Sequence, residues 1–345
     1  MSLLEIEDLE VHFPIRRGIL LERTVGRVRA VDGVSLSVAA GTTYGLVGES
    51  GCGKTTLGRA VLRLVDVTAG RVRLGGVDLA GLRSEELRRS RRRVQMVFQD
   101  PLGSLDPRQN VESLLLEGLE VHGLGADRAA RRAAVVDALE AVGLSARALP
   151  RYPHEFSGGQ RQRVGIARAL VLSPELIVCD EPVSALDVSI QAQVLNLLEE
   201  LQRERGLAYL VIAHDLAVVR HVSDTVGVMY LGALVEEAPG DGLYAEPLHP
   251  YTRSLISAVP VPDPAVEDGR RRILLRGDLP SPADPPPGCR FHTRCPWRQE
   301  ELCATDRPEL RPVAGGHKVA CHYAERIAAG EIAPDTAAPP RRAGP

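Results

Sequence analysis

The feature that most constrains the fold is a glycine-rich stretch at residues 48–55, which reads Gly-Glu-Ser-Gly-Cys-Gly-Lys-Thr. It lies between residues 44–47, an apolar run typical of a buried strand, and residues 55–64, whose apolar spacing predicts a helix. Glycines there let successive backbone N–H groups converge on phosphate oxygens, at a helix N-terminus that already favours negative charge. Lys54 would neutralise the β and γ phosphates, and Thr55 would coordinate Mg²⁺. The stretch therefore predicts a phosphate-binding loop.

A second apolar run, residues 176–179, ends in the two carboxylates Asp180 and Glu181. A buried strand that ends there would deliver Asp180 towards the Mg²⁺ and Glu181 towards the attacking water. Strand and helix patterns alternate from residue 160 to residue 213, which favours a mainly parallel sheet covered by helices. Helical periodicity within about residues 105–170 indicates an inserted helical subdomain. The predicted fold class is therefore α/β.

Residues 156–160, Phe-Ser-Gly-Gly-Gln, lie between these two motifs. They resemble the signature sequence of the ABC ATPases, and the chain resembles that family over about residues 3–235. The resemblance implies an ABC-type phosphate-loop domain with a mainly parallel core sheet, an antiparallel β subdomain and a helical insert. It also implies that the signature presses on the nucleotide held by an opposite subunit, so that two chains sandwich two ATP molecules.

The same resemblance assigns roles to further residues. Gln99 matches the glutamine that touches Mg²⁺ and senses the membrane partner, and His214 matches the switch histidine near the γ-phosphate. Phe13 lies near the position of the aromatic residue that stacks on adenine. Catalysis is assigned to Glu181 as general base, His214 and Gln99, and Mg²⁺ binding to Thr55, Gln99 and Asp180. The residues predicted to contact ATP or its Mg²⁺ are Phe13, Gly48, Glu49, Ser50, Gly51, Cys52, Gly53, Lys54, Thr55, Thr56, Gln99, Ser157, Gly158, Gly159, Gln160, Asp180 and Asp187.

Several longer stretches are similar to the ATPases of dipeptide and oligopeptide importers, nearer their F-type than their D-type subunit. These stretches are residues 45–54, 97–101, 152–163, 180–194 and 249–252. The likeness implies a second ABC ATPase subunit in a heterodimer, two transmembrane permease subunits and an extracytoplasmic substrate-binding protein as partners. It places the chain at the cytoplasmic face of the cell membrane. Dipeptides, oligopeptides, glutathione and nickel all remain open as cargo.

Cys289, Cys295, Cys303 and Cys321 crowd into 33 residues near the end of the chain. Because cytosolic proteins rarely keep structural disulfides, such clustering indicates a metal or cluster site. The importers carry four matching cysteines that ligate a 4Fe-4S cluster, so the resemblance implies the same group here. Such a cluster could staple a segment too Pro-rich to build its own core, which is the role we favour, or sense oxidation. Zinc and reduced free thiols remain alternatives, although the spacing lacks the C-x2-C pairs common in zinc ribbons.

The predicted organisation is an ATPase domain at residues 1–235, a C-terminal domain with the four-Cys site at residues 236–330, and a disordered tail at residues 331–345. A net charge of -3 gives no basic field for nucleic acid. Apolar runs fall far short of the roughly 20 residues that span a bilayer, and residues 1–10 do not resemble a secretory signal.

Two other classes of protein deserve comparison. A soluble ABC ATPase of DNA repair or translation would carry two cassettes or a long coiled-coil insertion, and the sequence has neither. An iron-sulfur redox sensor with a vestigial nucleotide fold would not need the complete set of catalytic residues.

Overall fold

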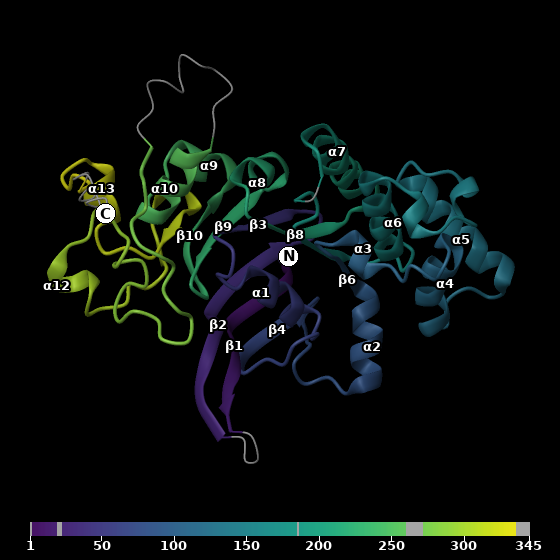
Figure 1. Ribbon diagram of the computed structural model, residues 1–345, viewed down its shortest axis with the longest axis horizontal. Helices are drawn as coiled ribbons and strands as arrows, with labels where there is room; N and C mark the ends of the chain where they lie inside the picture. The colour runs from purple at the N-terminus through teal and green to yellow at the C-terminus, as the bar shows by residue number, and fades with distance from the viewer. Residues whose placement is uncertain (1, 19–22, 185, 260–271, 336–345) are drawn as a thin grey trace, which may run out of the picture.

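The computed structural model describes residues 2–18, 23–184, 186–259 and 272–335 (Figure 1). Most of the predicted tail, residues 336–345, lies outside the described residues. Within the described ranges, no helix combines the length and the apolar character needed to cross a membrane.

An eight-stranded sheet forms the centre of the molecule, in the order β11-β12-β10-β9-β3-β8-β7-β6. Its five consecutive strands from β9 to β6 are parallel, which confirms the predicted mainly parallel sheet. Three antiparallel strands, β10, β12 and β11, extend it. Strand β10 runs across residue 235, where the sequence places the domain boundary. The bounds are β3 (Thr43–Val47), β6 (Val94–Val97), β7 (Leu176–Asp180), β8 (Ala208–Ala213), β9 (Thr225–Tyr230), β10 (Ala233–Pro239), β11 (Arg311–Pro312) and β12 (Lys318–Val319).

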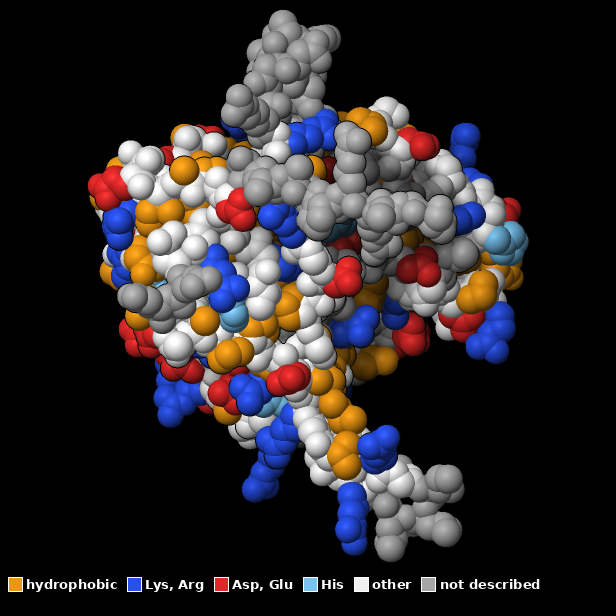
Figure 2. Space-filling model, turned by 60° about the vertical axis from the view of Figure 1, so that its left-hand side comes forward, with side chains coloured by type: hydrophobic (Ala, Val, Ile, Leu, Met, Phe, Trp, Pro, Cys, Tyr) orange, Lys and Arg blue, Asp and Glu red, His pale blue; other side chains and the backbone are white. Residues whose placement is uncertain are grey.

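A separate antiparallel sheet has the order β2-β1-β4-β5. It comprises β1 (Ser2–Arg17), β2 (Arg23–Ala39), β4 (Ala69–Leu74) and β5 (Val77–Asp78). The β1 and β2 strands continue past the core as a projecting hairpin, on which Arg side chains gather (Figures 1 and 2). This sheet is the antiparallel β subdomain that the family resemblance implies.

Helices cover the sheets and build the insert. The helical subdomain contains α4 (Val111–Val121), α5 (Arg128–Ala141) and α6 (Gly158–Leu170), on the opposite side of the molecule from the C-terminal segments (Figure 1). Each of these helices begins at a residue whose side chain accepts a backbone N–H: Asn110, Asp127 and Ser157. The other helices are α1 (Lys54–Val61), α2 (Ser84–Arg93), α3 (Pro101–Ser104), α7 (Val188–Arg205), α8 (Leu216–Val222), α9 (Gly240–Ala245), α10 (Pro250–Ala258), α12 (Glu300–Cys303) and α13 (Ala324–Ala328), with 3₁₀ turns η1 (Ala146–Ala148), η2 (Pro153–Glu155) and η3 (Ala314–Gly316).

The parallel strands are buried on both faces. Every residue of β3, β7 and β8 is buried. Because side chains alternate along a strand, Ile177 and Cys179 join the core on the side of the helical subdomain, whereas Leu176 and Val178 join the core beneath α1 and the antiparallel sheet. Apolar cores on both faces fix the strand ends, and the candidate site lies at those ends.

Candidate nucleotide site and four-cysteine site

The glycine-rich stretch forms the loop between β3 and α1, as the sequence predicts. At two positions only glycine fits, because other backbone segments approach the loop too closely for a side chain. A Cβ at Gly53 would lie 1.9 Å from the Ala30 carbonyl oxygen, and its φ of +106° disfavours any other residue. A Cβ at Gly48 would lie 2.1 Å from the Met229 carbonyl oxygen. The loop conformation therefore depends on these two glycines.

Lys54 begins α1, and its side chain folds back over the loop. The ammonium group donates to the carbonyl oxygens of Gly48 at 2.7 Å and Glu49 at 3.0 Å, and only 5% of the residue is exposed. The Cys52 thiol lies beside the same ammonium group, with Sγ 3.7 Å from Nζ. A buried cation held at the first turn of a helix is suited to binding phosphate.

Thr55 and Asp180, the two residues expected to bind Mg²⁺, lie together. The Thr55 hydroxyl donates to Oδ1 of Asp180 at 2.8 Å, across 125 residues of sequence. Burial raises the pKa of the Asp180 carboxyl above its usual value, in spite of the Thr55 hydrogen bond. A bound cation would offset this penalty, so a buried carboxylate beside a hydroxyl fits Mg²⁺, which prefers oxygen ligands.

The three proposed catalytic side chains meet at the ends of β6, β7 and β8. The Glu181 carboxylate accepts a hydrogen bond from Nε2 of Gln99 at 2.9 Å and lies 3.2 Å from Nδ1 of His214. Glu181 has a φ of +47°, and its backbone N–H donates to Ile212 in β8. The side chain lines a cavity of about 50 Å³ together with His214, which exceeds the roughly 10–15 Å³ that one water needs. The arrangement can hold and activate a water molecule.

The signature residues lie elsewhere. The Ser157 hydroxyl oxygen accepts a hydrogen bond from the backbone of Gln160 and so caps α6, and both Ser157 and Gly158 are exposed. Helix α6 belongs to the helical subdomain and is separated from α1 (Figure 1). Asp187 at the start of α7 is also exposed, and its neighbour Val188 is 82% exposed. A single chain therefore does not bring these residues to its own phosphate loop.

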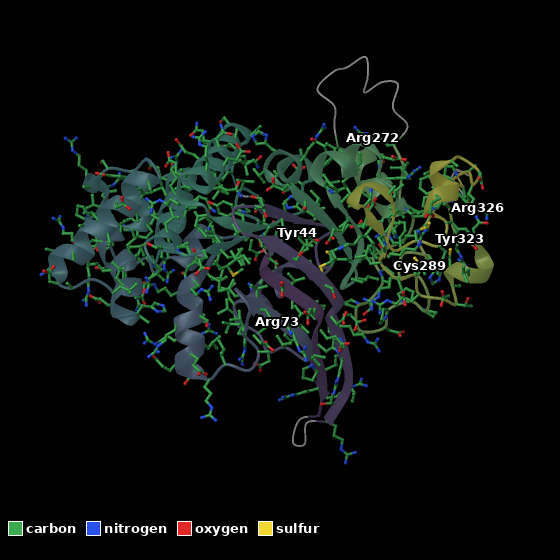
Figure 3. All side chains as sticks on the ribbon, turned by 180° about the vertical axis from the view of Figure 1, so that it is seen from behind. Tyr44, Arg73, Arg272, Cys289, Tyr323 and Arg326 are labelled. Carbon is green, nitrogen blue, oxygen red and sulfur yellow. The ribbon has the colours of Figure 1, made fainter. Side chains whose placement is uncertain are left out.

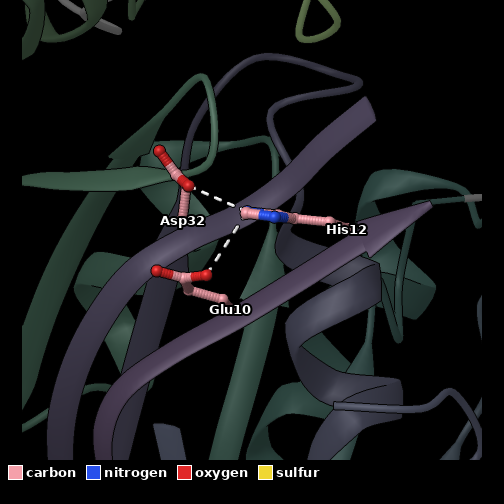
Figure 4. Close-up of side chains that lie close together, drawn as sticks. All are labelled: Glu10, His12 and Asp32. Atoms are coloured by element: carbon pink, nitrogen blue, oxygen red, sulfur yellow. Dashed lines mark hydrogen bonds and ion pairs between the residues drawn. The ribbon is translucent and has the colours of Figure 1, made fainter. Parts of the chain in front are cut away.

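Phe13 lies on β1 opposite Val28 of β2 and is 41% exposed. Beside it, Nε2 of His12 lies 2.8 Å from Asp32 and 3.9 Å from Glu10 (Figure 4). The aromatic ring of Phe13 has free surface on this hairpin, and its stacking on adenine stays a prediction.

The Glu10, His12 and Asp32 side chains form a compact group of potential metal ligands. Asp32, however, already pairs with the buried guanidinium of Arg290 and lies 3.5 Å from that of Arg307. Two neighbouring cations make this group unsuited to a further cation. The Asp32 contacts were missed by sequence reasoning, since 258 residues separate Asp32 from Arg290.

The four clustered cysteines line one cavity of about 20 Å³. Cys289 lies on the side of the molecule that also carries Tyr323 (Figure 3), and its N–H donates to the Cys303 carbonyl. Burial raises the pKa of the Cys289 thiol to about 11 and that of Cys321 to about 12, and it also raises the pKa of Cys295. A bound cationic group would stabilise the thiolates instead.

The spread of the four sulfur atoms bears on which group could fit. A single tetrahedral zinc, with Zn–S bonds of about 2.3 Å, would hold the sulfurs about 3.8 Å apart. Among the described residues, Glu10, His12 and Asp32 form the one group of potential ligands whose atoms all lie within 4.8 Å of one another. The cysteines thus converge on one cavity, but more widely than a single zinc requires.

Known proteins match the chain over nearly its whole length. The family described as ABC transporter matches residues 31–184, and the oligopeptide/dipeptide transporter C-terminal region matches residues 235–303. The chain is 54% identical over 322 residues to a putative oligopeptide transport ATP-binding protein, YkfD, of Bacillus subtilis (strain 168), covering 93% of this chain and 95% of that protein. It is 55% identical to the oligopeptide transport ATP-binding protein AppF of the same organism, covering 93% and 97%.

Solved structures agree with the fold. An ATP-binding cassette, solved as a dimer in a post-hydrolysis state bound to ADP and phosphate, superposes with a TM-score of 0.61 at 27% identity, covering 68% of this chain and 98% of that one. A dimeric bacterial ABC transporter cassette gives 0.60 at 26% identity, with the same coverage. The predicted family and ATPase fold are confirmed, and the chain belongs to the ABC transporter family as an ATP-binding, ATP-hydrolysing subunit.

Proposed function

We propose that the chain powers the import of oligopeptides or dipeptides through a membrane permease. The observation that carries the ATPase part is the contact of Gln99 and His214 with the Glu181 carboxylate, which lines a small cavity together with His214. Glu181 directly follows Asp180, whose carboxylate accepts the Thr55 hydrogen bond. The cargo is supported by the relatives, which are named oligopeptide transport ATP-binding proteins.

In the proposed mechanism, Lys54 and the N–H groups of the phosphate loop bind the phosphates. Thr55, Asp180 and Gln99 would hold Mg²⁺, which when bound neutralises charge on the phosphate oxygens. Glu181 accepts a proton from water as that water attacks the γ-phosphorus in line and the bond to the β–γ bridging oxygen breaks. His214, whose Nδ1 lies 3.2 Å from Glu181, keeps this carboxylate in place.

Closure of a two-chain sandwich completes this site. The exposed residues Ser157, Gly158 and Asp187, with Gly159 and Gln160 behind them, are available to reach the nucleotide of an opposite subunit. We infer that this subunit is a related ATPase in a heterodimer. Two transmembrane permease subunits hold the pair at the cytoplasmic face of the membrane, and an extracytoplasmic protein delivers the cargo.

Replacement of Glu181 by glutamine tests the proposal. We expect Glu181→Gln to lower ATP hydrolysis at least about 100-fold, because the amide accepts no proton, while ATP binding and closure of the sandwich persist. Hydrolysis and ATP-dependent uptake of labelled peptides are measured in proteoliposomes with the partner subunits. Glu204→Gln, at an exposed position on α7, is the matched control. A normal hydrolysis rate in Glu181→Gln would contradict the assigned role of this residue.

We also propose that Cys289, Cys295, Cys303 and Cys321 ligate a 4Fe-4S cluster that staples the C-terminal segments, with zinc as the alternative group. The convergence of all four cysteines on one cavity supports a group that they bind in common. Iron–sulfur clusters take four Cys thiolates as ligands.

Anaerobic purification with an absorption spectrum and metal analysis tests the cluster. We expect about four irons and four sulfides per chain and a broad visible band, lost in Cys289→Ser. Cys179→Ala, in β7 and outside the cavity, should keep both the iron and the band. One zinc without colour, or no metal at all, would contradict the cluster.

A further inference from the structure

Glu49 is the residue at which the C-terminal region touches the phosphate loop. Its backbone N–H donates to the hydroxyl oxygen of Tyr251 at 2.8 Å. Its carboxylate receives both terminal nitrogens of Arg294, Nη1 to Oε2 at 2.6 Å and Nη2 to Oε1 at 3.1 Å. Two independent contacts, one to the backbone and one to the side chain, thus hold the same loop residue across more than 200 residues of sequence.

These contacts belong to a packed aromatic group. Tyr251 is fully buried, and its ring centroid lies 4.8 Å from that of Tyr230 and 5.3 Å from that of Phe291. The Arg294 side chain is only 9% exposed, and its guanidinium carbon lies 5.9 Å from the centroid of the Tyr230 ring. A bidentate pair that involves such an enclosed guanidinium is geometrically specific, although the Glu49 side chain itself is 28% exposed.

The same group continues to the four-Cys cavity. Phe291 lines that cavity, and both Phe291 and Arg294 lie in the segment between Cys289 and Cys295. His249 lines it as well, and its Nδ1 accepts the N–H of Tyr251, so that it begins α10. Movement of the segment between Cys289 and Cys295 would displace Arg294 directly, and it would reach Tyr251 through the ring contact with Phe291.

The charge of Arg294 should affect the affinity for ATP, because Glu49 lies next to the expected phosphate site. The Glu49 carbonyl oxygen lies 3.0 Å from the Lys54 ammonium, which is expected to bind phosphate. An unpaired carboxylate on Glu49 would repel the triphosphate, and Arg294 neutralises it. The Tyr251 hydroxyl holds the loop backbone at Glu49. The N–H groups of the loop residues that follow Glu49 must point at the phosphates.

We propose that Arg294 and Tyr251 are positioning residues of the phosphate loop, through which ATP binding is coupled to the state of the four cysteines. This inference rests on the proposed nucleotide site but not on the identity of the metal. Coupling between two sites is reciprocal, so ATP must change the four-Cys segment by the same factor by which that segment changes the affinity for ATP.

Substitution of Arg294 in the full chain tests whether this residue supports ATP binding. The Kd of a non-hydrolysable ATP analogue with Mg²⁺, measured by calorimetry, should rise at least about fivefold in Arg294→Gln. Arg298→Gln, at an exposed position three residues beyond Cys295, should leave the Kd unchanged. Equal Kd values in the two variants would overturn the proposal. A wild-type chain that bound no analogue would instead contradict the nucleotide site itself.

Further variants separate positioning from folding. The KM for ATP should rise in Arg294→Gln, while kcat at saturating ATP stays within about twofold. In Arg294→Lys the rise in KM should be smaller, because lysine keeps the positive charge but cannot form the bidentate pair. Glu49→Gln added to Arg294→Gln should lower the Kd again, since no unpaired carboxylate remains. Tyr251→Phe, which removes one hydroxyl, should also raise the Kd. A fall in kcat with an unchanged KM would overturn the positioning role.

The reciprocal effect, that of ATP binding on the four-Cys segment, is measured by the reactivity of the cysteines. A chelator that removes the bound metal frees Cys289 and Cys295 for alkylation. The rate of this alkylation, followed residue by residue with mass spectrometry, should fall when the ATP analogue is bound. This protection should shrink in Arg294→Gln at analogue concentrations that saturate both proteins. Equal protection in the wild-type chain and the variant, or none in either, would overturn the coupling.

Discussion

At the scale of single residues, Gly53 shows how a sequence pattern and its physical cause can be separated. The pattern of the phosphate loop predicts a glycine there to admit phosphate. The structure adds a second cause, because the Ala30 carbonyl oxygen occupies the place of a side chain. The residue is therefore needed to build the loop as well as to bind the ligand.

Gly53→Ala should consequently damage the loop even without nucleotide. Its Cβ would lie 1.9 Å from a backbone oxygen at a φ of +106°, so the loop must shift, at a cost of about 1–3 kcal/mol for the strained conformation alone. Binding of ATP should be lost, and the melting temperature should fall. Calorimetry and thermal unfolding measure the two effects.

Gly165→Ala is the matched control for that substitution. Gly165 lies inside α6, and a Cβ there would meet nothing within 4 Å. Alanine should be tolerated or stabilise the helix by up to about 1 kcal/mol. If the two variants melted alike and bound ATP alike, the steric account of Gly53 would be wrong.

Local motifs predicted which residues come together wherever each follows a strand of one parallel sheet. Thr55 lies against Asp180, and Gln99 lies against Glu181, for this reason. The pairing of Glu49 with Arg294 had no such signal. No sequence pattern links a glutamate in a glycine-rich loop to an arginine among cysteines. Only the tertiary packing brings the two side chains into contact.

At the scale of elements, the sequence predicts the existence of strands better than their length. Alternation of apolar and polar residues indicates a strand near the start of the chain, but β1 extends to Arg17 and β2 begins at Arg23. Most residues of these extensions are exposed, so no buried face imposes a period of two. The hairpin is held by backbone pairing that runs from Phe13 opposite Val28 to the ends of both strands.

The structure explains the motif at residues 249–252 by its position at the start of a helix. In the sequence it is only a point of likeness to peptide importers. In the structure, His249 caps α10 and Pro250 occupies its first turn, where its missing N–H costs nothing. The helix start thereby fixes Tyr251 in the aromatic group that reaches Glu49. Sequence could supply the motif but not the partner.

At the scale of the whole molecule, the C-terminal region is built into the ATPase fold at several places. Strand β12 pairs with β10, and so a short strand of the C-terminal region extends the central sheet. On the other side, Arg290 reaches Asp32 of β2, in the antiparallel sheet. The two ends of the chain are thus joined through a buried ion pair, which should contribute to the stability of the whole.

Asp32→Asn tests this contribution. The substitution leaves the buried Arg290 guanidinium without its charged partner, which typically lowers the free energy of unfolding by about 3–5 kcal/mol. Urea unfolding at pH 7 measures the loss. Asp66→Asn is the control, because Asp66 is exposed and its replacement should change stability by less than about 0.5 kcal/mol.

The pH dependence of that loss follows from the pKa of Asp32. Burial alone would raise this pKa, but the guanidinium of Arg290, with His12 and Arg307, holds it below its usual value. A carboxyl group whose pKa is lower in the folded state than in the unfolded chain stabilises the fold fully above the unfolded value of about 3.9. This stabilisation is lost as the pH falls through the lower, folded value. The wild-type chain and Asp32→Asn should therefore differ at pH 5 by at least as much as at pH 7, because protonation of His12 adds a cation beside Asp32. The difference should shrink below about pH 4. A difference that instead vanished between pH 7 and pH 5 would contradict the pairing of Asp32 with Arg290 as its source.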